Sequence, residues 1–307
     1  MRRPAALRGV ALVGAALLAG CSTAPAPLPL FRPALADRFA EAPASTQEPV
    51  AQFWRGFHDA ELDRLVAAAL VANADLRIAA ARLDEARALA RVADSQAAPD
   101  VAFAASAVRA RARDPNGVPV TANGFSAGVD TRWEADLFGA IRGERRAAAA
   151  DAEASSAQLR AVQVSVAAEV ARNYFALRGL QEQLRVAVAA LGSQRATFEL
   201  VNERLSAGRG SGFDADRAEA LMHSTAASIP ALEASLAHTR YRLAVLSGQA
   251  PTALDARLAA PQPLPGIAPT ALASIGSPQA LLRRRPDIAA AEQQVAAAAA
   301  RIGVARS

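Results

Sequence analysis

The feature that most constrains this chain is residues 136–207, which contain no proline. Apolar side chains recur there at spacings of three and four residues, the pattern of a coiled-coil seam. At 1.5 Å per residue the predicted helix is on the order of 105 Å long, so it favours extended coiled-coil packing over an ordinary globular core. The seam positions are Val166, Val170, Leu177, Leu180, Leu184, Ala187, Leu191, Phe198, Val201 and Leu205.

Two shorter helices are predicted on either side of the long one, over 61–97 and 214–247. Pro99 stops the first, and Gly248 stands where a left-handed cap would end the second. Their lengths, roughly 55 and 51 Å, add up to that of the long helix. We therefore expect them to stack end to end and antiparallel to it, as a rod. The seam of the first helix is Leu76, Ala79, Leu83, Ala86, Ala90 and Ala93.

A β-hairpin is predicted over 99–136, between the first two helices. Apolar and polar residues alternate in 123–136, and in 99–114 apolar residues alternate first with smaller or polar ones and are then followed by Arg109, Arg111 and Arg113 at every second position. This period of two is typical of a strand with two different faces. The stretch 114–122 supplies turn residues. Each strand is long enough to cross a membrane at a tilt, although a soluble hairpin with one wet face would give the same pattern.

Composition excludes several classes of protein. The chain is 52% hydrophobic but only 5% aromatic, because alanine dominates, and this suits closely packed helices. Its net charge of +5 comes from arginine alone and is spread among the acids, so we expect no nucleic-acid partner. The histidines show no metal-ligand spacing, and the glycines of 207–213 follow a helix and lack a lysine. We expect no enzyme, catalytic residue, metal or cofactor.

The first residues read as a targeting signal, 1–20. Three arginines precede a twelve-residue apolar segment, 9–20, which is far too short to span a bilayer. It ends in Leu18, Ala19, Gly20 and Cys21, which matches the bacterial lipobox. We therefore predict a covalent lipid on Cys21, followed by a proline-rich tether over 21–52. Cys21 is the only cysteine, which rules out an intrachain disulfide.

The end of the chain repeats its first helix. Aligning Asp75 with Asp287 places apolar residues on apolar residues, after a proline-rich linker over 249–285. Residues 286–307 then read as the start of a second repeat, and we expect about 150 further residues in a complete second copy. The predicted seam of this last helix is Ile288, Ala291, Val295, Ala298, Ile302 and Ala305.

Taken together, these segments resemble the TolC-like outer-membrane efflux protein family, in its lipoprotein branch (OprM/NodT type). The resemblance runs in order from residue 1 to 307 and covers about two thirds of a typical member, with WEADLFG and RRRPDIAAAE the most specific pieces. The other pieces are the lipobox, FWRGFHDAELDRLVAAALVANADL (53–76), EVARNYFALR (169–178), the Gly208-x-x-Ser211-x-x-Asp214-x-x-x-Ala218 tip and LAVLSGQAP (243–251).

The resemblance implies a mainly α fold with a membrane β-hairpin, the first of two structural repeats. Its long antiparallel coiled-coil helices would form an α-barrel, and its strands part of a trimeric β-barrel. The implied protein is a passive channel of a tripartite efflux system. It would be a homotrimer that meets outer-membrane lipid, a periplasmic adaptor and an inner-membrane pump. Ser22 after the lipobox favours the outer membrane, with the protein lipid-anchored and extending into the periplasm.

Two groups of site residues follow from the resemblance. The candidate adaptor-docking tip is Leu205, Gly208, Ser211 and Asp214, although these residues also suit a plain helix-turn-helix connection. The strand-helix junction is Trp133, Asp136, Phe138 and Gly139. Its aromatics fit a membrane boundary or a packed core, and Asp136 can cap the long helix. The family's gate lies in the second repeat, so no gate residues are assigned.

A second class of function stays open at this stage, a periplasmic coiled-coil lipoprotein or adaptor. It accounts for the lipobox and the heptads but not for a membrane-length hairpin between helices. Migration as a heat-modifiable, detergent-resistant trimer would separate the two classes. Three such chains would supply six strands, fewer than the twelve of the family's barrel, so we expect this chain alone to be a fragment of the working channel.

Overall fold

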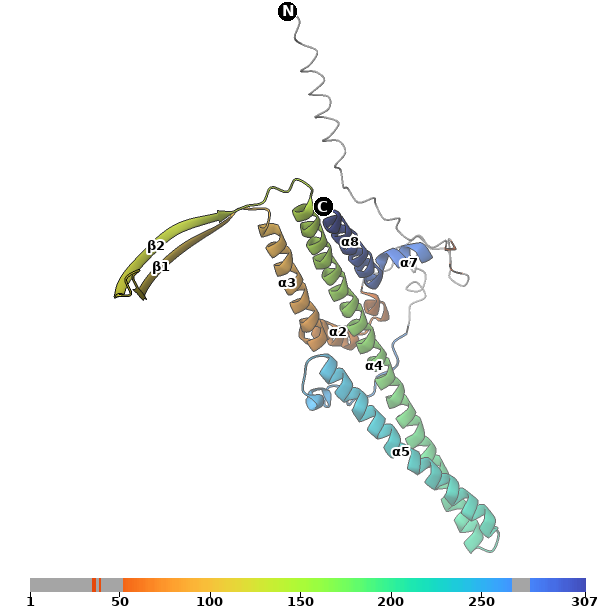
Figure 1. Ribbon diagram of the computed structural model, residues 1–307. Coiled ribbons are helices and arrows are strands. Elements are labelled where there is room, and N and C mark those ends of the chain that lie inside the picture. Colours follow the sequence, from red (N-terminus) through yellow and green to blue (C-terminus); the bar gives the residue numbers. More distant parts are fainter. Residues whose placement is uncertain (1–34, 37–38, 40–51, 267–276) are drawn as a thin grey trace, which may run out of the picture. The chain divides into compact units, whose positions relative to one another are not determined.

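The computed structural model describes residues 35–36, 39, 52–266 and 277–307, which form two compact units. One unit lies within 82–157 and 289–307, and the other within 33–81 and 158–288. The predicted signal, its lipobox and Cys21 lie outside the described residues, as does almost all of the tether. The elements (Figure 1) are η1 (Phe53–Phe57), α2 (Ala60–Ala72), α3 (Ala74–Ser95), β1 (Asp100–Arg113), β2 (Pro119–Arg132), α4 (Ala140–Ser206), α5 (Gly212–Leu246), η2 (Pro251–Leu254), α7 (Pro278–Arg284) and α8 (Pro286–Arg306).

The proline-free stretch forms one unbroken helix, α4, of 67 residues. Its seam positions are the ones that the fold covers: Val166, Val170 and Leu177 are buried, and those further along are half-buried. Along the C-terminal part of α4, α5 runs back antiparallel (Figure 1). An ion pair between Arg242 of α5 and Glu169 of α4 joins the two helices.

The predicted single helix over 61–97 is wrong at Asn73, where the structure divides it into α2 and α3. The backbone of Asn73 is extended, and its side-chain oxygen accepts hydrogen bonds from the N–H groups of Asp75 (2.9 Å) and Leu76 (3.3 Å). Its amide nitrogen donates to the carbonyl of Leu246 at 3.0 Å. The buried amide thus caps α3 and holds the end of α5, and these bonds replace those of a continuous helix.

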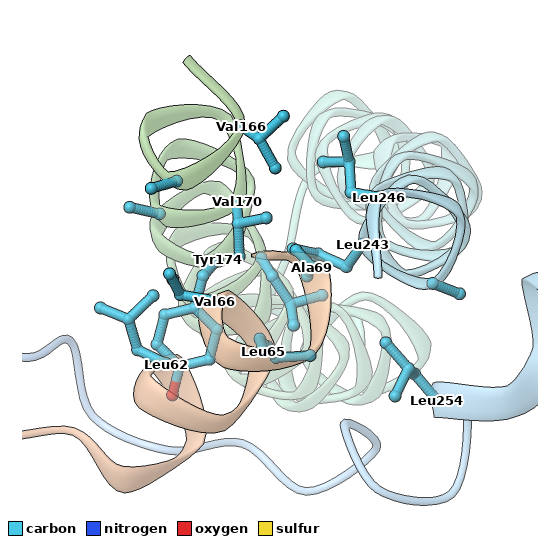
Figure 2. Close-up of a cluster of buried hydrophobic side chains, with 14 of the residues drawn as sticks. Leu62, Leu65, Val66, Ala69, Val166, Val170, Tyr174, Leu243, Leu246 and Leu254 are labelled. Atoms are coloured by element: carbon cyan, nitrogen blue, oxygen red, sulfur yellow. The ribbon is translucent and has the colours of Figure 1, made fainter. Parts of the chain in front are cut away.

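The core of the second unit lies where α2, α4, α5 and η2 meet (Figure 2). One face of α2 points into it, and α4 contributes Tyr174 and two valines. Burial of this apolar surface is the main force that holds the short helices together. The labelled side chains are Leu62, Leu65, Val66, Ala69, Val166, Val170, Tyr174, Leu243, Leu246 and Leu254.

Gly248 ends α5 in the left-handed conformation that its place in the sequence predicts, with φ of 69°. Its N–H donates to the carbonyl of Val245, and the next N–H, of Gln249, donates to that of Ala244. These two bonds make a Schellman motif. A side chain at Gly248 would also meet the carbonyl oxygen of Ala72 at 2.7 Å, so the turn packs directly on the end of α2.

The segment 249–285, predicted to be an irregular linker, contains two short helices among its described residues. Pro251 opens η2, and the side chain of Ser277 caps α7 by accepting from the N–H of Ala280 at 3.1 Å. Leu254 and Leu258 are fully buried in the core of the second unit. Part of this segment therefore belongs to the core, a correction to the linker interpretation. Prolines at the first turn of a helix explain it, because they favour a helix start rather than prevent one.

The last helix, α8, begins at Pro286 as the start signal predicts, but its predicted seam is wrong. Ala290 and Ala297 are buried, whereas Val295 and Ile302 are about half exposed, at 51% and 49%. A Cβ atom at Gly143 of α4 would meet the side chain of Val304 at 2.6 Å, so α8 packs on α4 through its small residues. Arg301 and Asp151 form an ion pair across the same contact.

Candidate functional site

The predicted hairpin is an antiparallel ribbon of two 14-residue strands, paired without interruption from Asp100–Arg132 to Arg113–Pro119. The second strand begins at Pro119 rather than at 123, since a proline is tolerated as the first residue of a strand. Phe103 faces Val129, and Ala107 faces Phe125. Every residue of both strands is exposed, so nothing in the described part of the chain covers the apolar face.

The other face of the hairpin is polar near the helices. Ser106 and Ser126 lie opposite each other, with their hydroxyl oxygens 2.9 Å apart. Asp130 and the terminal pair Asp100 and Arg132 share this face. The half of the ribbon near the helices therefore has one apolar and one polar face, both uncovered, and this arrangement is suited to separate hydrocarbon from water.

At the strand-helix junction, Asp136 caps the long helix although it lies four residues before the first residue of α4. Its carboxylate accepts hydrogen bonds from the N–H groups of Ile141 (3.3 Å) and Arg142 (3.0 Å), and from the guanidinium of Arg142 (3.0 Å). Desolvation raises the pKa of Asp136, but these bonds outweigh it and hold the pKa below its ordinary value. Gly139 makes the intervening turn with φ of 90°.

The two junction aromatics lie at the surface. Trp133 is 59% exposed and Phe138 is 57% exposed, so neither packs in a core of this chain. The indole N–H of Trp133 donates to the carbonyl of Ala97 at 3.3 Å, which ties the two ends of the hairpin together. An amphipathic ring held in this way, with its body uncovered, suits a membrane-water boundary.

The tip between α4 and α5 is a Schellman turn followed by a capped helix. Gly208 has φ of 71°. Its N–H donates to the carbonyl of Leu205, and the N–H of Arg209 donates to the carbonyl of Arg204. The hydroxyl of Ser211 then accepts from the N–H of Phe213 at 3.2 Å and caps α5.

Of the predicted tip residues, Leu205 is half-buried, whereas Gly208, Ser211 and Asp214 are exposed. The structure adds Phe213, which is 71% exposed beside them and was not predicted. The sequence could have indicated this residue, because Phe213 is the single aromatic residue of the turn AGRGSGF. A Cβ atom at Gly210 would meet the backbone nitrogen of Leu205 at 2.9 Å, which explains a second glycine in the turn.

Replacing Gly208 by alanine is expected to destabilise the chain by about 1 kcal/mol, because a Cβ atom disfavours the left-handed backbone. Gly192 is the matched control: it lies within α4 and no atom comes within 4 Å of its Cβ position. There alanine should stabilise the chain by about 0.5–1 kcal/mol, through helix propensity. Urea unfolding followed by circular dichroism measures both, and equal effects of the two substitutions would contradict the assigned turn.

A buried polar cluster, which was not predicted, joins α2 and α4 to the segment after η2. The hydroxyl of Tyr174 donates to Asp59 at 2.6 Å and accepts from Arg178 at 3.1 Å. Arg178 also donates to Gln181 (2.9 Å) and to the carbonyl of Ala260 (3.1 Å). Gln181 donates in turn to the carbonyl of Leu258 at 2.9 Å.

This cluster shifts two pKa values in opposite directions. Burial raises the pKa of Tyr174, and its hydrogen bond to the Asp59 carboxylate adds to the shift, giving a value of about 12. Burial raises the pKa of Asp59, but the hydrogen bonds from Tyr174 and from two backbone N–H groups outweigh it and lower the pKa overall. The pair is therefore a neutral phenol that donates to a carboxylate at neutral pH.

Stability should fall as pH rises from about 10 to about 12, because the Tyr174 hydroxyl ionises in the unfolded chain before it does so in the folded one. Tyr174→Phe should remove part of this slope. Tyr241, which is 38% exposed, provides the control variant Tyr241→Phe. Urea midpoints measured across this pH range test the expectation, and the same slope in wild type and Tyr174→Phe would refute it.

No helix in the described part of the chain is long and apolar enough to cross a membrane. In the same residues, no three or more His, Cys, Asp or Glu side chains gather into a group that could hold a metal ion.

Comparison with known proteins decides the family. The model of the outer membrane efflux protein family matches residues 65–249, which is more than half of the chain. The chain belongs to the outer membrane efflux protein family. The match spans α3, the hairpin, its junction, α4 and α5, so it includes the hairpin, the strand-helix junction and the tip. Family membership places the chain among outer-membrane proteins.

Relatives of known function are similar to this outer membrane efflux protein over almost its whole length. The pyoverdine export outer membrane protein OpmQ of Pseudomonas aeruginosa is 31% identical, over 98% of this chain and 65% of OpmQ. Nodulation protein T of Rhizobium leguminosarum bv. trifolii is 30% identical, over 95% of this chain and 62% of its own length. The chain therefore spans just under two thirds of the length of these two relatives.

Solved structures of the family agree with the fold. The outer-membrane channel OprN superimposes with a TM-score of 0.80 at 38% identity, over 91% of this chain and 63% of that one. VceC of Vibrio cholerae superimposes with a TM-score of 0.72 at 27% identity, over 84% of this chain and 61% of VceC. The fold class is thus that of a TolC-like channel, mainly helical with a two-stranded antiparallel sheet.

Proposed function

We propose that this chain is the outer-membrane component of a tripartite efflux or export system, in which it forms a passive conduit from the periplasm to the exterior. The observation that carries the proposal is the family match, which covers a long two-faced hairpin set between coiled-coil helices. A passive conduit needs no catalytic group. Among the described residues, Asp136 and Ser211 cap helices, and Arg178 and Gln181 form buried hydrogen bonds in the core.

The proposed assembly is a homotrimer. Each protomer would insert its hairpin in the outer membrane as part of a shared β-barrel, with the apolar face toward lipid. The helices would line a periplasmic α-barrel. A lipid on Cys21 would hold the chain at the same membrane, since two anchors are more stable than one. What supports this arrangement is the exposure of the apolar hairpin face and of the junction aromatics.

The proposed partners are a periplasmic adaptor and, through it, an inner-membrane pump. The adaptor would dock at the tip, on Leu205, Gly208, Ser211 and Asp214, with the exposed Phe213 as an apolar anchor. Relatives are named for the export of pyoverdine, toluene and solvents, which are small molecules. Small molecules of this kind are the proposed cargo.

The test is to express the chain, joined to the second repeat of a relative so that three copies supply all twelve strands, with an adaptor and a pump in a Gram-negative strain that lacks its own efflux channel. Lower accumulation of a fluorescent dye is the expected result, together with an outer-membrane trimer that survives detergent and dissociates on heating. A coiled-coil lipoprotein or adaptor would give neither. A trimer in the outer membrane with unchanged dye accumulation would overturn the conduit and leave the family assignment intact. Cys21→Ser should abolish incorporation of labelled palmitate.

A further inference from the structure

The apolar face of the hairpin changes its chemistry halfway along. From Val101 to Ala107 this face is apolar on β1, and Phe125 to Val129 continue it on β2. Toward the turn the same face carries Arg109, Arg111 and Arg113 at alternate positions. At about 3.4 Å per residue, Arg109 and Arg113 are about 14 Å apart along the strand.

No acid of the strands neutralises these arginines. Their cross-strand neighbours are Asn123, Thr121 and Pro119, none of which is charged. The strand carboxylates, Asp100 and Asp130, lie on the opposite face at the far end.

Two of the three guanidinium groups also have no partner elsewhere in the described chain. Neither Arg109 nor Arg111 has a hydrogen bond or an ion pair within the residues that the structure describes. Arg113 donates to the carbonyl of Gly117 at 2.6 Å, and a backbone carbonyl leaves its charge unneutralised. The nearby carboxylate of Asp114 is used by the turn, where it accepts from the N–H groups of Asn116 and Val118.

The arginines and the apolar residues are on the same face because the pairing contains no bulge. All fourteen cross-strand pairs follow one register, from Asp100–Arg132 to Arg113–Pro119. A bulge would exchange the two faces, and none occurs. If the apolar side chains near the helices face the hydrocarbon of the membrane, the three arginines therefore face the lipid as well. They lie closer to the turn, past the last apolar residue of that face.

We propose that Arg109, Arg111 and Arg113 bind the phosphate groups of the glycolipid in the outer leaflet of the membrane. This inference rests on the membrane placement given under the proposed function. An arginine that faces lipid is costly at the middle of a bilayer and well tolerated near its surface. Its aliphatic stem lies along hydrocarbon while the guanidinium reaches the headgroups. The planar guanidinium also matches phosphate with two parallel hydrogen bonds, which a lysine ammonium does not.

The experiment measures binding of the full chain to three kinds of vesicle. One is phosphatidylcholine alone, one contains added lipid A with both phosphates, and one contains lipid A from which the phosphates have been removed. Affinity is obtained by flotation at increasing lipid concentration. Insertion is measured separately, as protection of the hairpin from protease and resistance to carbonate extraction.

The variants are matched in charge and position. Arg111→Gln and Arg132→Gln each remove one exposed arginine from the same hairpin, on opposite faces. We expect Arg111→Gln to weaken binding to the vesicles that contain phosphorylated lipid A roughly fivefold. The double variant Arg109→Gln, Arg111→Gln should weaken it roughly 25-fold. Arg132→Gln should leave it unchanged. Lysine at both positions should restore part of the loss, since the charge returns without the planar fork.

The outcomes separate the inference from the proposed function. A preference for phosphorylated lipid A that depends on Arg109 and Arg111 supports it. Equal binding to all three vesicles, or an equal loss in Arg132→Gln, overturns it. Displacement by millimolar inorganic phosphate overturns the lipid as ligand in favour of free phosphate. If the chain inserts into phosphatidylcholine but ignores the phosphates, this inference alone fails. If it inserts into no vesicle, the membrane role proposed above fails with it.

Discussion

Replacing Leu243 by alanine is expected to lower the free energy of unfolding by about 2–5 kcal/mol, because the change opens a cavity in the core of the second unit. Leu243 is fully buried, and its side chain lies among those of α2, α4 and η2 (Figure 2). The deleted atoms lose their packing contacts in this cluster, to which α2, α4 and η2 also contribute buried side chains. Equilibrium unfolding in urea, followed by circular dichroism, measures the change.

Leu221 provides the control on the same helix. It is 57% exposed, so Leu221→Ala should change stability by less than about 0.5 kcal/mol. If both variants lost the same stability, the core would not lie where α2, α4, α5 and η2 meet.

Replacing Arg178 by leucine should cost about 3 kcal/mol, the second large effect. The guanidinium is 3% exposed and gives hydrogen bonds to Gln181, to Tyr174 and to the carbonyl of Ala260. It also stacks over the ring of Tyr174, 4.9 Å from the centroid. A leucine fills part of the volume but leaves buried acceptors without a donor, which costs more than the bonds themselves contributed.

Arg172 is the matched control, because it lies on the same helix and is exposed. Arg172→Leu should alter stability by less than about 0.5 kcal/mol. Arg178→Lys should fall between the two, since an ammonium keeps the charge but reaches fewer acceptors. The urea midpoint distinguishes these results. A loss in Arg172→Leu as large as in Arg178→Leu would mean that any charge on this helix matters, and would rule out a specific role for the buried cluster.

The elements with a strong repeating pattern were predictable from sequence. The heptads of 136–207 predict a helix that the structure has as α4, and the strict alternation around Phe103 and Phe125 predicts the two faces of the hairpin. Gly248 was predictable for a local reason, because few residues other than glycine adopt a left-handed turn.

The failures have two physical causes. Asn73 and Arg178 act through backbone carbonyls 173 and 82 residues away, at Leu246 and Ala260, and no local pattern records such partners. In α8 the cause is composition: alanine is compatible with several helix faces, so a stripe through Val295 fitted the spacing as well as the true contact through Ala297. Small residues permit close packing on any face of a helix, so the sequence does not indicate which face makes the contact.

The bond between Asn73 and Leu246 also sets the order in which the second unit can fold. A contact between residues 173 apart closes late, because the entropy of the intervening loop must be lost first. A chain synthesised from its N-terminus contains α2 well before it contains α5 and Leu258. During that interval the leucines of α2 have no core to enter. Until α5 and Leu258 are present, the apolar face of α2 therefore stays uncovered, and exposed apolar surface of this kind is prone to aggregation.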